Sequence, residues 1–213
     1  MKKLLTIAIA VLFCSASAFA ALSWTYGWED GTGTALGTYG NAIVSNSTEQ
    51  AYEGTHSLKL IENPYGGTPQ AFVWWVTGLS SGDVVNAIFY VYDTTPSASP
   101  SGRIWGHYTD GVDVNSYQGS ASGNSTYSDG SGWSPLTNTW TFTTDGTDGR
   151  TGLVVEARIY SDTVGQSIYI DTTSIIVSND NAKIYNAAGQ VIPEPFMFSA
   201  LILGLGVLFL RKK

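Results

Sequence analysis

The sequence predicts an all-β protein, an antiparallel β-sandwich or jelly roll, followed by a single C-terminal transmembrane helix. Three observations lead to this prediction. Short stretches that alternate apolar with polar residues recur between Ala21 and Ser178, where no helical periodicity is found. Clusters of Gly, Pro, Asn, Asp and Ser separate these stretches at roughly even spacing, as in sandwiches and jelly rolls. The last long apolar run, 196–210, contains no charged residue.

The first half of the body is expected to contain five strands. Their candidate ranges are 22–28, 42–45, 56–61, 70–77 and 84–93. The range 84–93 has the strongest pattern, because Ala87, Phe89 and Val91 all fall on one face of a strand with period two. In 70–77 the same rule places Phe72 and Trp74 together on one face.

Four more strands are expected in the second half, at 103–109, 133–144, 152–161 and 167–177. In 152–161 the apolar Leu153, Val155, Ala157 and Ile159 share one face, and Glu156 lies on the other beside Arg158, its expected partner. The stretch 110–132 has no periodicity and is interpreted as a loop or an irregular edge. The stretch 179–191 is interpreted as a polar linker that ends the domain 21–178.

The first twenty residues have the form of a secretory signal peptide. Lys2 and Lys3 precede an apolar run, 4–13, and the small-x-small pattern of 18–20 predicts cleavage after Ala20 by a signal peptidase. The single cysteine, Cys14, lies within this segment. The exported chain is therefore expected to have no disulfide, no thiol chemistry and no thiolate metal site.

The last segment, 192–213, combines Pro193-Glu194-Pro195, the apolar run 196–210 and three terminal cations. A helix over 196–210 would be about 22 Å long, somewhat short for a bilayer core of about 30 Å. The terminal cations favour a cytoplasmic C-terminus. This arrangement resembles the PEP-CTERM sorting signal of Gram-negative bacteria. The resemblance implies anchoring in the inner membrane, processing by an exosortase, and a final place at the cell surface or outside the cell, often with extracellular polysaccharide.

The charge of the body narrows the choice of partners. The whole chain has a formal net charge of −7, but five of its cations lie in the two terminal segments. Between residues 21 and 195, five cations face seventeen acidic residues, a formal charge of about −12. Such a surface repels nucleic acid, so no nucleic-acid partner is expected, whereas it suits divalent cations.

The body resembles a jelly-roll carbohydrate-binding module of the galactose-binding-like type. Four stretches in order carry the resemblance: Gly-Trp-Glu-Asp-Gly at 27–31, Glu-Gly-Thr-His-Ser-Leu-Lys-Leu at 53–60, Gly-Leu-Ser-Ser-Gly-Asp at 78–83 and Ile-Tyr-Ile-Asp at 168–171. It implies a structural Ca²⁺ ion, bound by a set of carboxylates and backbone carbonyls: Glu29, Glu53 and Asp171, with carbonyls of Gly27 and His56. The alternative is that these are ordinary acids of turns and rims.

Sugar binding requires exposed aromatic rings with a few polar groups beside them. Seven residues that could line the second face of a sheet are Trp75, Tyr90, Tyr92, Trp105, His107, Arg158 and Tyr160. Alternation shows which face of its own strand each residue occupies, but it does not show how the strands are aligned with one another. The alternative is therefore that these side chains only pack against their neighbours.

No catalytic residues are assigned, because the sequence has neither a Gly-x-Ser-x-Gly elbow nor a His-Glu-x-x-His motif. The favoured function is a non-enzymatic, exported protein of the cell surface or matrix that binds extracellular polysaccharide. Two alternatives stay open: a structural matrix protein without a specific ligand, and a small secreted enzyme acting on glycans, for which Glu156 is the candidate acid.

Overall fold

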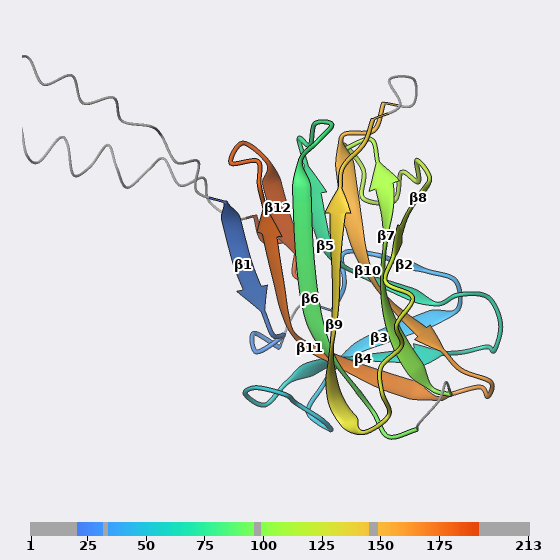
Figure 1. Cartoon of the computed structure of the whole chain (residues 1–213). Helices are drawn as coiled ribbons and strands as arrows, with labels where there is room; N and C mark the ends of the chain where they lie inside the picture. Colours follow the sequence, from blue (N-terminus) through green and yellow to red (C-terminus); the bar gives the residue numbers. More distant parts are fainter. Residues whose placement is uncertain (1–20, 32–33, 96–98, 145–148, 192–213) are drawn as a thin grey trace, which may run out of the picture.

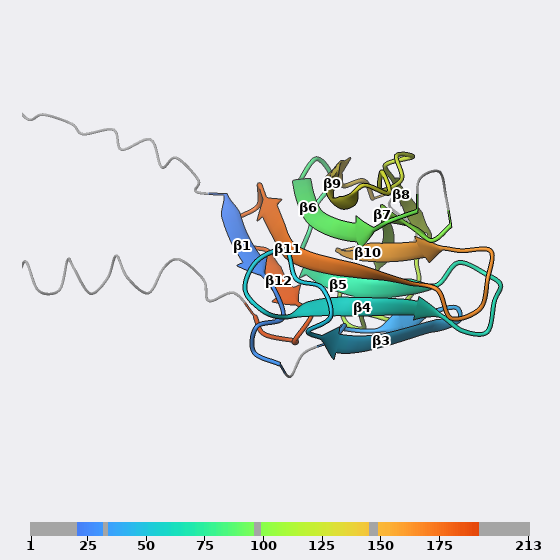
Figure 2. The same cartoon turned by 90° about the horizontal axis from the view of Figure 1, so that it is seen from below.

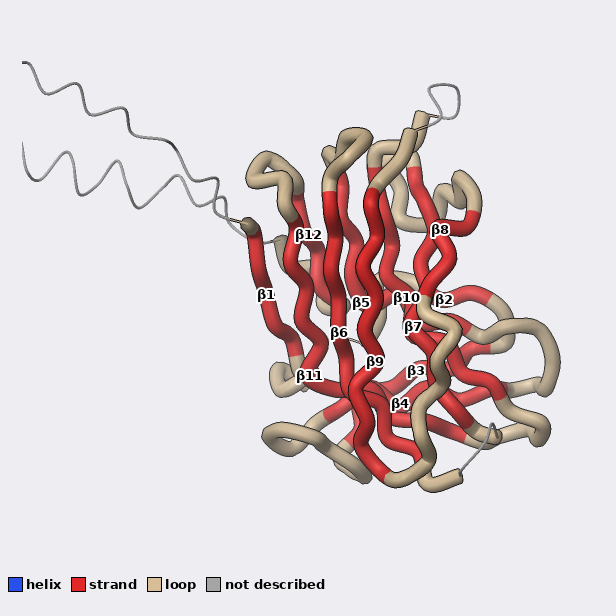
Figure 3. Tube along the Cα trace, in the orientation of Figure 1, coloured by secondary structure: helices blue, strands red, loops and turns tan. Residues whose placement is uncertain are grey.

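Two antiparallel β-sheets pack face to face in the computed structural model, which describes residues 21–31, 34–95, 99–144 and 149–191 (Figures 1 and 3). The prediction of an antiparallel sandwich is confirmed, and this part of the chain contains no helix. It follows that no helix able to cross a membrane is found there. The expected signal peptide, 1–20, and the expected membrane helix, 196–210, lie outside the described residues.

Sheet A has the strand order β3-β4-β11-β6-β9, and β1 pairs with β11. Its strands are β1 (Leu22–Tyr26), β3 (Ala42–Ser47), β4 (Ser57–Glu62), β6 (Val84–Asp93), β9 (Gly132–Thr141) and β11 (Ser167–Val177). The long β11 organises this sheet: it pairs with β4 through its first half, with β1 through its second half, and with β6 along its other edge.

Sheet B has the order β12-β5-β10-β7-β8, and the short β2 pairs with the beginning of β5. Its strands are β2 (Thr38–Tyr39), β5 (Gln70–Thr77), β7 (Ser101–Thr109), β8 (Ser120–Gly123), β10 (Gly152–Tyr160) and β12 (Lys183–Asn186). The strand β10 pairs with both β5 and β7. Figure 2, seen from below, shows the neighbouring strands β3 and β4 of sheet A side by side.

The core lies between the sheets and is built by the alternation read from the sequence. In β6, Phe89 and Val91 are fully buried, and in β10, Val155 and Ile159 are fully buried. All four belong to one apolar cluster. Burial of such side chains stabilises the fold by roughly 1.5–3 kcal/mol each. Because one face of each sheet is used in this way, the opposite face of sheet B is free to carry a site.

One strand departs from simple alternation. Between Val155 and Glu156 the pairing of β10 with β5 shifts, so that Val155 opposes Trp74 whereas Glu156 opposes Phe72. The extra residue is Val73, which joins Trp74 in the buried core. Such a β-bulge changes which face the following side chains occupy. The expectation that Phe72 and Trp74 share a face is therefore wrong: Trp74 points into the core, and Phe72 points outward.

Two segments interpreted as irregular contain strands. The stretch 110–132 includes β8, and the stretch 179–191 includes β12, so the latter is not only a linker. Ile184 of β12 is fully buried in the core, and Tyr185 pairs with Trp75 of β5. The domain thus extends beyond Ser178, because a four-residue strand with one buried isoleucine completes the edge of sheet B.

The role of β12 gives a first prediction. Ile184→Ala should lower the free energy of unfolding by about 2–5 kcal/mol, because it leaves a cavity in the core. Lys183→Ala, at the exposed neighbouring position, is the matched control and should change it by less than about 0.5 kcal/mol. Urea unfolding of both variants measures the difference. Equal stability of the two variants would show that β12 is not part of the cooperative fold.

Candidate functional site

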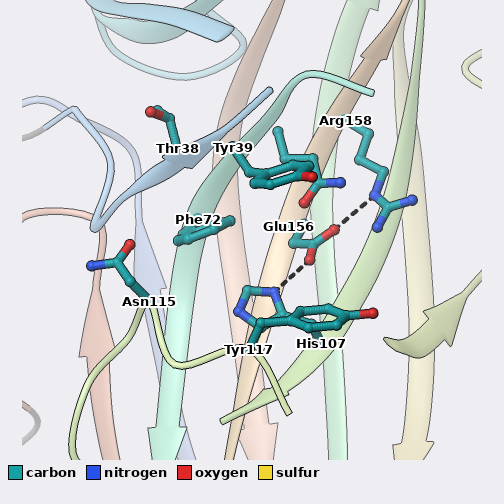
Figure 4. Close-up of a pocket in the computed structure, with 9 residues that line it drawn as sticks. Thr38, Tyr39, Phe72, His107, Asn115, Tyr117, Glu156 and Arg158 are labelled. Carbon is teal, nitrogen blue, oxygen red and sulfur yellow. Dashed lines mark hydrogen bonds and ion pairs between the residues drawn. The ribbon is translucent and has the colours of Figure 1, made fainter. Parts of the chain in front are cut away.

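The outer face of sheet B carries a cavity of about 450 Å³, a size typical of small-ligand sites. Strands β5, β10 and β7 supply its floor, and β2 and the loop between β7 and β8 supply its walls (Figure 4). The lining residues are Thr38, Tyr39, Gln70, Phe72, His107, Asn115, Tyr117, Glu156 and Arg158.

The carboxylate of Glu156 forms the centre of the floor, and only 1% of this residue is exposed. His107 Nδ1 lies 2.5 Å from Glu156 Oε1, and Arg158 Nε lies 2.7 Å from Oε2. With Glu156 ionised, Nδ1 of His107 is the donor in this pair, because an ionised carboxylate only accepts hydrogen bonds. The expected pairing of Glu156 with Arg158 is confirmed, and the buried charge is compensated from two sides, as burial of a carboxylate requires.

Gln70 completes this network from β5. With its side-chain amide turned so that the nitrogen faces Glu156, Gln70 donates to both carboxylate oxygens, over 3.1 and 3.0 Å. Its amide oxygen then accepts from Arg158 Nη2 at 3.2 Å. The pairing register explains why these groups meet, since Gln70 opposes Arg158 and Phe72 opposes Glu156. Three neighbouring strands therefore hold one carboxylate in a fixed orientation.

Two exposed tyrosines form the walls. Tyr39 is 65% exposed and Tyr117 is 66% exposed. In Figure 4 their rings lie on opposite sides of Glu156, Tyr39 from β2 and Tyr117 from the loop after β7. The segment that carries Tyr39 can approach the floor because Gly37 has no side chain: a Cβ atom there would lie 2.8 Å from the Phe72 ring. Two exposed rings on either side of a polar floor offer apolar surface to a ligand bound above Glu156.

The structure divides the seven predicted ligand residues between two faces. His107 and Arg158 line the cavity. Trp75, Trp105 and Tyr160 belong to the strands of the same sheet but lie outside the lining. The side chain of Trp75 packs on Tyr185, with ring centroids 4.9 Å apart, and Trp105 contacts the guanidinium of Arg158.

Tyr90 and Tyr92 lie in β6 and so belong to sheet A, on the opposite side of the sandwich. The ring of Tyr90 stacks on Tyr52 with centroids 3.8 Å apart, and Tyr92 packs against Trp133 and Tyr169. These rings cover one another. The idea that all seven residues line one face of one sheet is therefore wrong, because the parity of a strand does not say to which sheet it belongs.

Most of the cavity was not expected from the sequence as a ligand site. The bulge at Val73 places Phe72 on the face opposite to the one that alternation predicts, and no pattern in the sequence marks Gln70 as a ligand residue. Tyr39 and Tyr117 lie in polar stretches that show no strand periodicity. The available signal was chemical: an aromatic residue isolated in a Gly-, Ser- and Asn-rich stretch has no neighbouring apolar residues with which to form a core.

Four of the five expected calcium ligands lie at the loop 52–56, because the loop contains Glu53 and His56, and Asp171 and Glu29 bond to its backbone. The fifth, Gly27, is adjacent, since a Cβ atom there would lie 3.2 Å from Asp171 Oδ1. Asp171 is fully buried and accepts from the backbone N–H of Tyr52 and Glu53, and Glu29 accepts from the backbone N–H of Thr55 and His56. Each of these two carboxylates accepts three hydrogen bonds, which leaves about one of its four lone-pair sites for a cation. No group of three or more His, Cys, Asp or Glu residues in the described ranges is arranged for a metal.

The electrostatics of this loop nevertheless suit a cation. Burial raises the pKa of Asp171, and the nearby charge of Glu29 adds to the effect, although three backbone hydrogen bonds oppose it. A raised pKa means that the ionised carboxylate is costly in the folded state at neutral pH. A bound divalent cation would offset that cost. Calcium at Glu29, Glu53, Asp171, Gly27 and His56 stays a prediction.

Comparison with solved structures identifies the fold. The chain is similar to the CBM22-1 xylan-binding domain of Paenibacillus barcinonensis Xyn10C, with a TM-score of 0.51 and 19% identity over 76% of this chain and 99% of that domain. It is also similar to the CBM22-2 xylan-binding domain of the same protein, with a TM-score of 0.50 and 16% identity over 72% of this chain and 98% of that domain. No protein-family model and no curated protein matches the sequence. At these identities the likeness shows the sandwich fold.

The calcium prediction is tested by metal removal. Saturating Ca²⁺ should raise the melting temperature of the protein by about 5–10 °C relative to excess EDTA. The reason is that Ca²⁺ at a hundredfold excess over the Kd of a site formed only on folding adds about 2.7 kcal/mol to the free energy of unfolding. Glu29→Gln, which removes a proposed ligand at the surface, should abolish the difference. A melting temperature of the unaltered protein that is indifferent to EDTA would rule out the site.

Proposed function

We propose that this protein is an exported, non-enzymatic protein of the cell surface or extracellular matrix that binds polysaccharide in the cavity of sheet B. The observation that carries the proposal is the pair of exposed rings, Tyr39 and Tyr117, on opposite sides of the buried Glu156. Aromatic side chains exposed on both walls of a cavity have no role in the core. They match the apolar faces of a sugar ring held between them.

The floor supplies the polar half of the recognition. Sugar hydroxyls need donors and acceptors in fixed positions, and the network of Glu156, His107, Arg158 and Gln70 holds such groups rigidly before any ligand arrives. Groups that are already ordered lose little conformational entropy on binding. Asn115, on the wall beside Tyr117, adds an amide that can both donate and accept.

The same geometry argues against glycoside hydrolysis. That reaction uses two carboxyl groups on either side of the scissile bond, roughly 5–10 Å apart. Among the described residues that line the cavity, Glu156 is the only carboxylic acid, and both of its oxygens are engaged by His107, Arg158 or the Gln70 amide. The similar solved domains are xylan-binding domains by name, which supports a binding role by analogy of fold.

The sequence supports the proposed route of export. The signal peptide 1–20, the sorting motif Pro193-Glu194-Pro195 and the apolar run 196–210 together favour passage across the inner membrane, temporary anchoring there and processing by an exosortase. The acidic, cysteine-free body is suited to an extracellular setting. A structural matrix protein without a ligand is the second candidate, but it gives no reason for two exposed tyrosines around a preorganised polar floor.

The cavity gives a direct prediction for binding. Tyr39→Ala and Tyr117→Ala should each weaken binding to the recognised polysaccharide about tenfold or more, a loss of at least about 1.4 kcal/mol, because each removes one stacking surface. Affinity electrophoresis against a panel of soluble polysaccharides measures the change.

The matched control is Tyr52→Ala, an exposed tyrosine beside the rings of sheet A. Binding that is lost in Tyr52→Ala but kept in the two cavity variants would move the site to the other face of the sandwich. No binding by the unaltered protein to any polysaccharide of a broad panel would favour the purely structural role.

The non-enzymatic role is tested separately. Prolonged incubation with the bound polysaccharide should release no new reducing ends. Release that disappears in Glu156→Gln while binding persists would contradict the proposal and favour a glycan-active enzyme with Glu156 as its acid.

A further inference from the structure

A second feature of the outer face of sheet B is an arginine surrounded by aromatic rings. Cζ of Arg103 lies 4.9 Å from the centroid of Trp105, 4.8 Å from that of Tyr127 and 5.5 Å from that of Tyr160. Tyr127 and Tyr160 also meet edge to face, with centroids 5.3 Å apart. Cation–π contacts at these distances orient a guanidinium without neutralising its charge.

The hydrogen bonds of Arg103 leave one edge of the guanidinium unused. Nε and Nη2 both donate to the backbone carbonyl of Asn124, over 3.2 and 3.1 Å. Of the five N–H groups of an arginine, three remain, and two of these lie side by side on the edge formed by Nη1 and Nη2. That edge has the fork geometry that binds a carboxylate through two parallel hydrogen bonds.

No carboxylate within the described ranges forms an ion pair with Arg103, whereas Lys59 pairs with Glu49 and Arg158 pairs with Glu156. Asp93 lies near the beginning of β7, but it is buried and accepts a hydrogen bond from Ser128, which in turn bonds to Gly102. In an acidic protein, a half-buried cation without a partner acid is a place where an anion from outside can bind.

This arginine is continuous with the cavity. Arg103 and Arg158 oppose each other across β7 and β10, and the ring of Trp105 contacts both guanidinium groups, at 4.9 and 4.6 Å. Trp105 in turn opposes Glu156. A polysaccharide chain bound over Glu156 and Arg158 on β10 therefore has to extend only to the neighbouring strand, β7, to reach Arg103. Tyr127, beside Arg103, is 41% exposed.

We propose that Arg103, Tyr127 and Tyr160 form a subsite for an acidic sugar unit, and that the polysaccharide bound in the cavity carries uronic acid. The carboxylate of the uronic acid pairs with the free edge of Arg103, and its ring packs on the exposed side of Tyr127. This inference rests on the proposed function, because it places the acidic unit next to the cavity and gives the class of polymer.

The test compares acidic polysaccharides with the same polymers after reduction of their carboxyl groups. Suitable probes are glucuronoxylan, polygalacturonate and alginate, each with its carboxyl-reduced product, and the full-length protein is used. At low salt we expect the protein to bind at least one acidic form about 5- to 10-fold more tightly than its reduced form, as a charge-assisted pair predicts. The preference should shrink at about 0.5 M NaCl, where charges are screened.

Substitutions separate the subsite from the cavity. Arg103→Gln should remove the preference for the acidic form and leave binding of the reduced form within about twofold, whereas Arg103→Lys should keep part of the preference through its charge. Lys183→Gln, which removes one exposed cation from β12, is the control for net charge and should keep the full preference. Melting temperatures of the three variants confirm that each is folded.

The possible outcomes are distinct. Equal binding of acidic and reduced polymers by the unaltered protein, or a preference that survives Arg103→Gln, overturns the subsite and leaves the cavity proposal intact. Absence of binding to every acidic and every reduced polymer overturns the subsite, and the cavity proposal falls with it only if the broad polysaccharide panel also shows no binding. Loss of the preference in Lys183→Gln as well would assign it to overall charge and also overturn the subsite.

Discussion

A carboxylate removed from water needs hydrogen-bond donors on several sides. The outer face of sheet B is organised around the donors that surround Glu156. Its donors come from three adjacent strands: His107 from β7, Arg158 from the same strand β10, and Gln70 from β5. Leaving any of them out would leave charge or polar groups buried without partners, which is costly in a medium of low dielectric constant. The requirement therefore fixes the floor of the cavity as a single polar unit.

The core and the cavity depend on each other through β5. Val73 adds one residue to this strand, so Trp74 fills the space between the sheets while Phe72 and Trp75 lie outside. The bulge also brings Phe72 opposite Glu156. The same local irregularity thus completes the packing of the sandwich and sets the side chains next to the buried carboxylate, a position at which bulges are commonly found.

The sequence was sufficient for the sandwich, because a strand with one buried face must alternate, as Phe89 and Val155 do in the core. It was not sufficient for the site. A bulge such as that at Val73 has no compositional signature, so the parity of Phe72 could not be known. Alternation along a strand also says nothing about which sheet the strand joins. It therefore does not separate Tyr90, on sheet A, from the candidate ligand residues of sheet B. The pairing of Glu156 with Arg158 was predictable because it is local.

The two tyrosines that flank the cavity belong to different kinds of structural element from the residues of its floor. Tyr39 follows a loop and lies on a two-residue strand, and Tyr117 lies within a loop, whereas Glu156 lies in the middle of a nine-residue central strand. Loops accept insertions and deletions far better than the strands that they connect. The width of the cavity can therefore change during evolution, or in protein engineering, while the charged floor is inherited unchanged. Such a domain can acquire a new ligand preference without having to rebuild its fold.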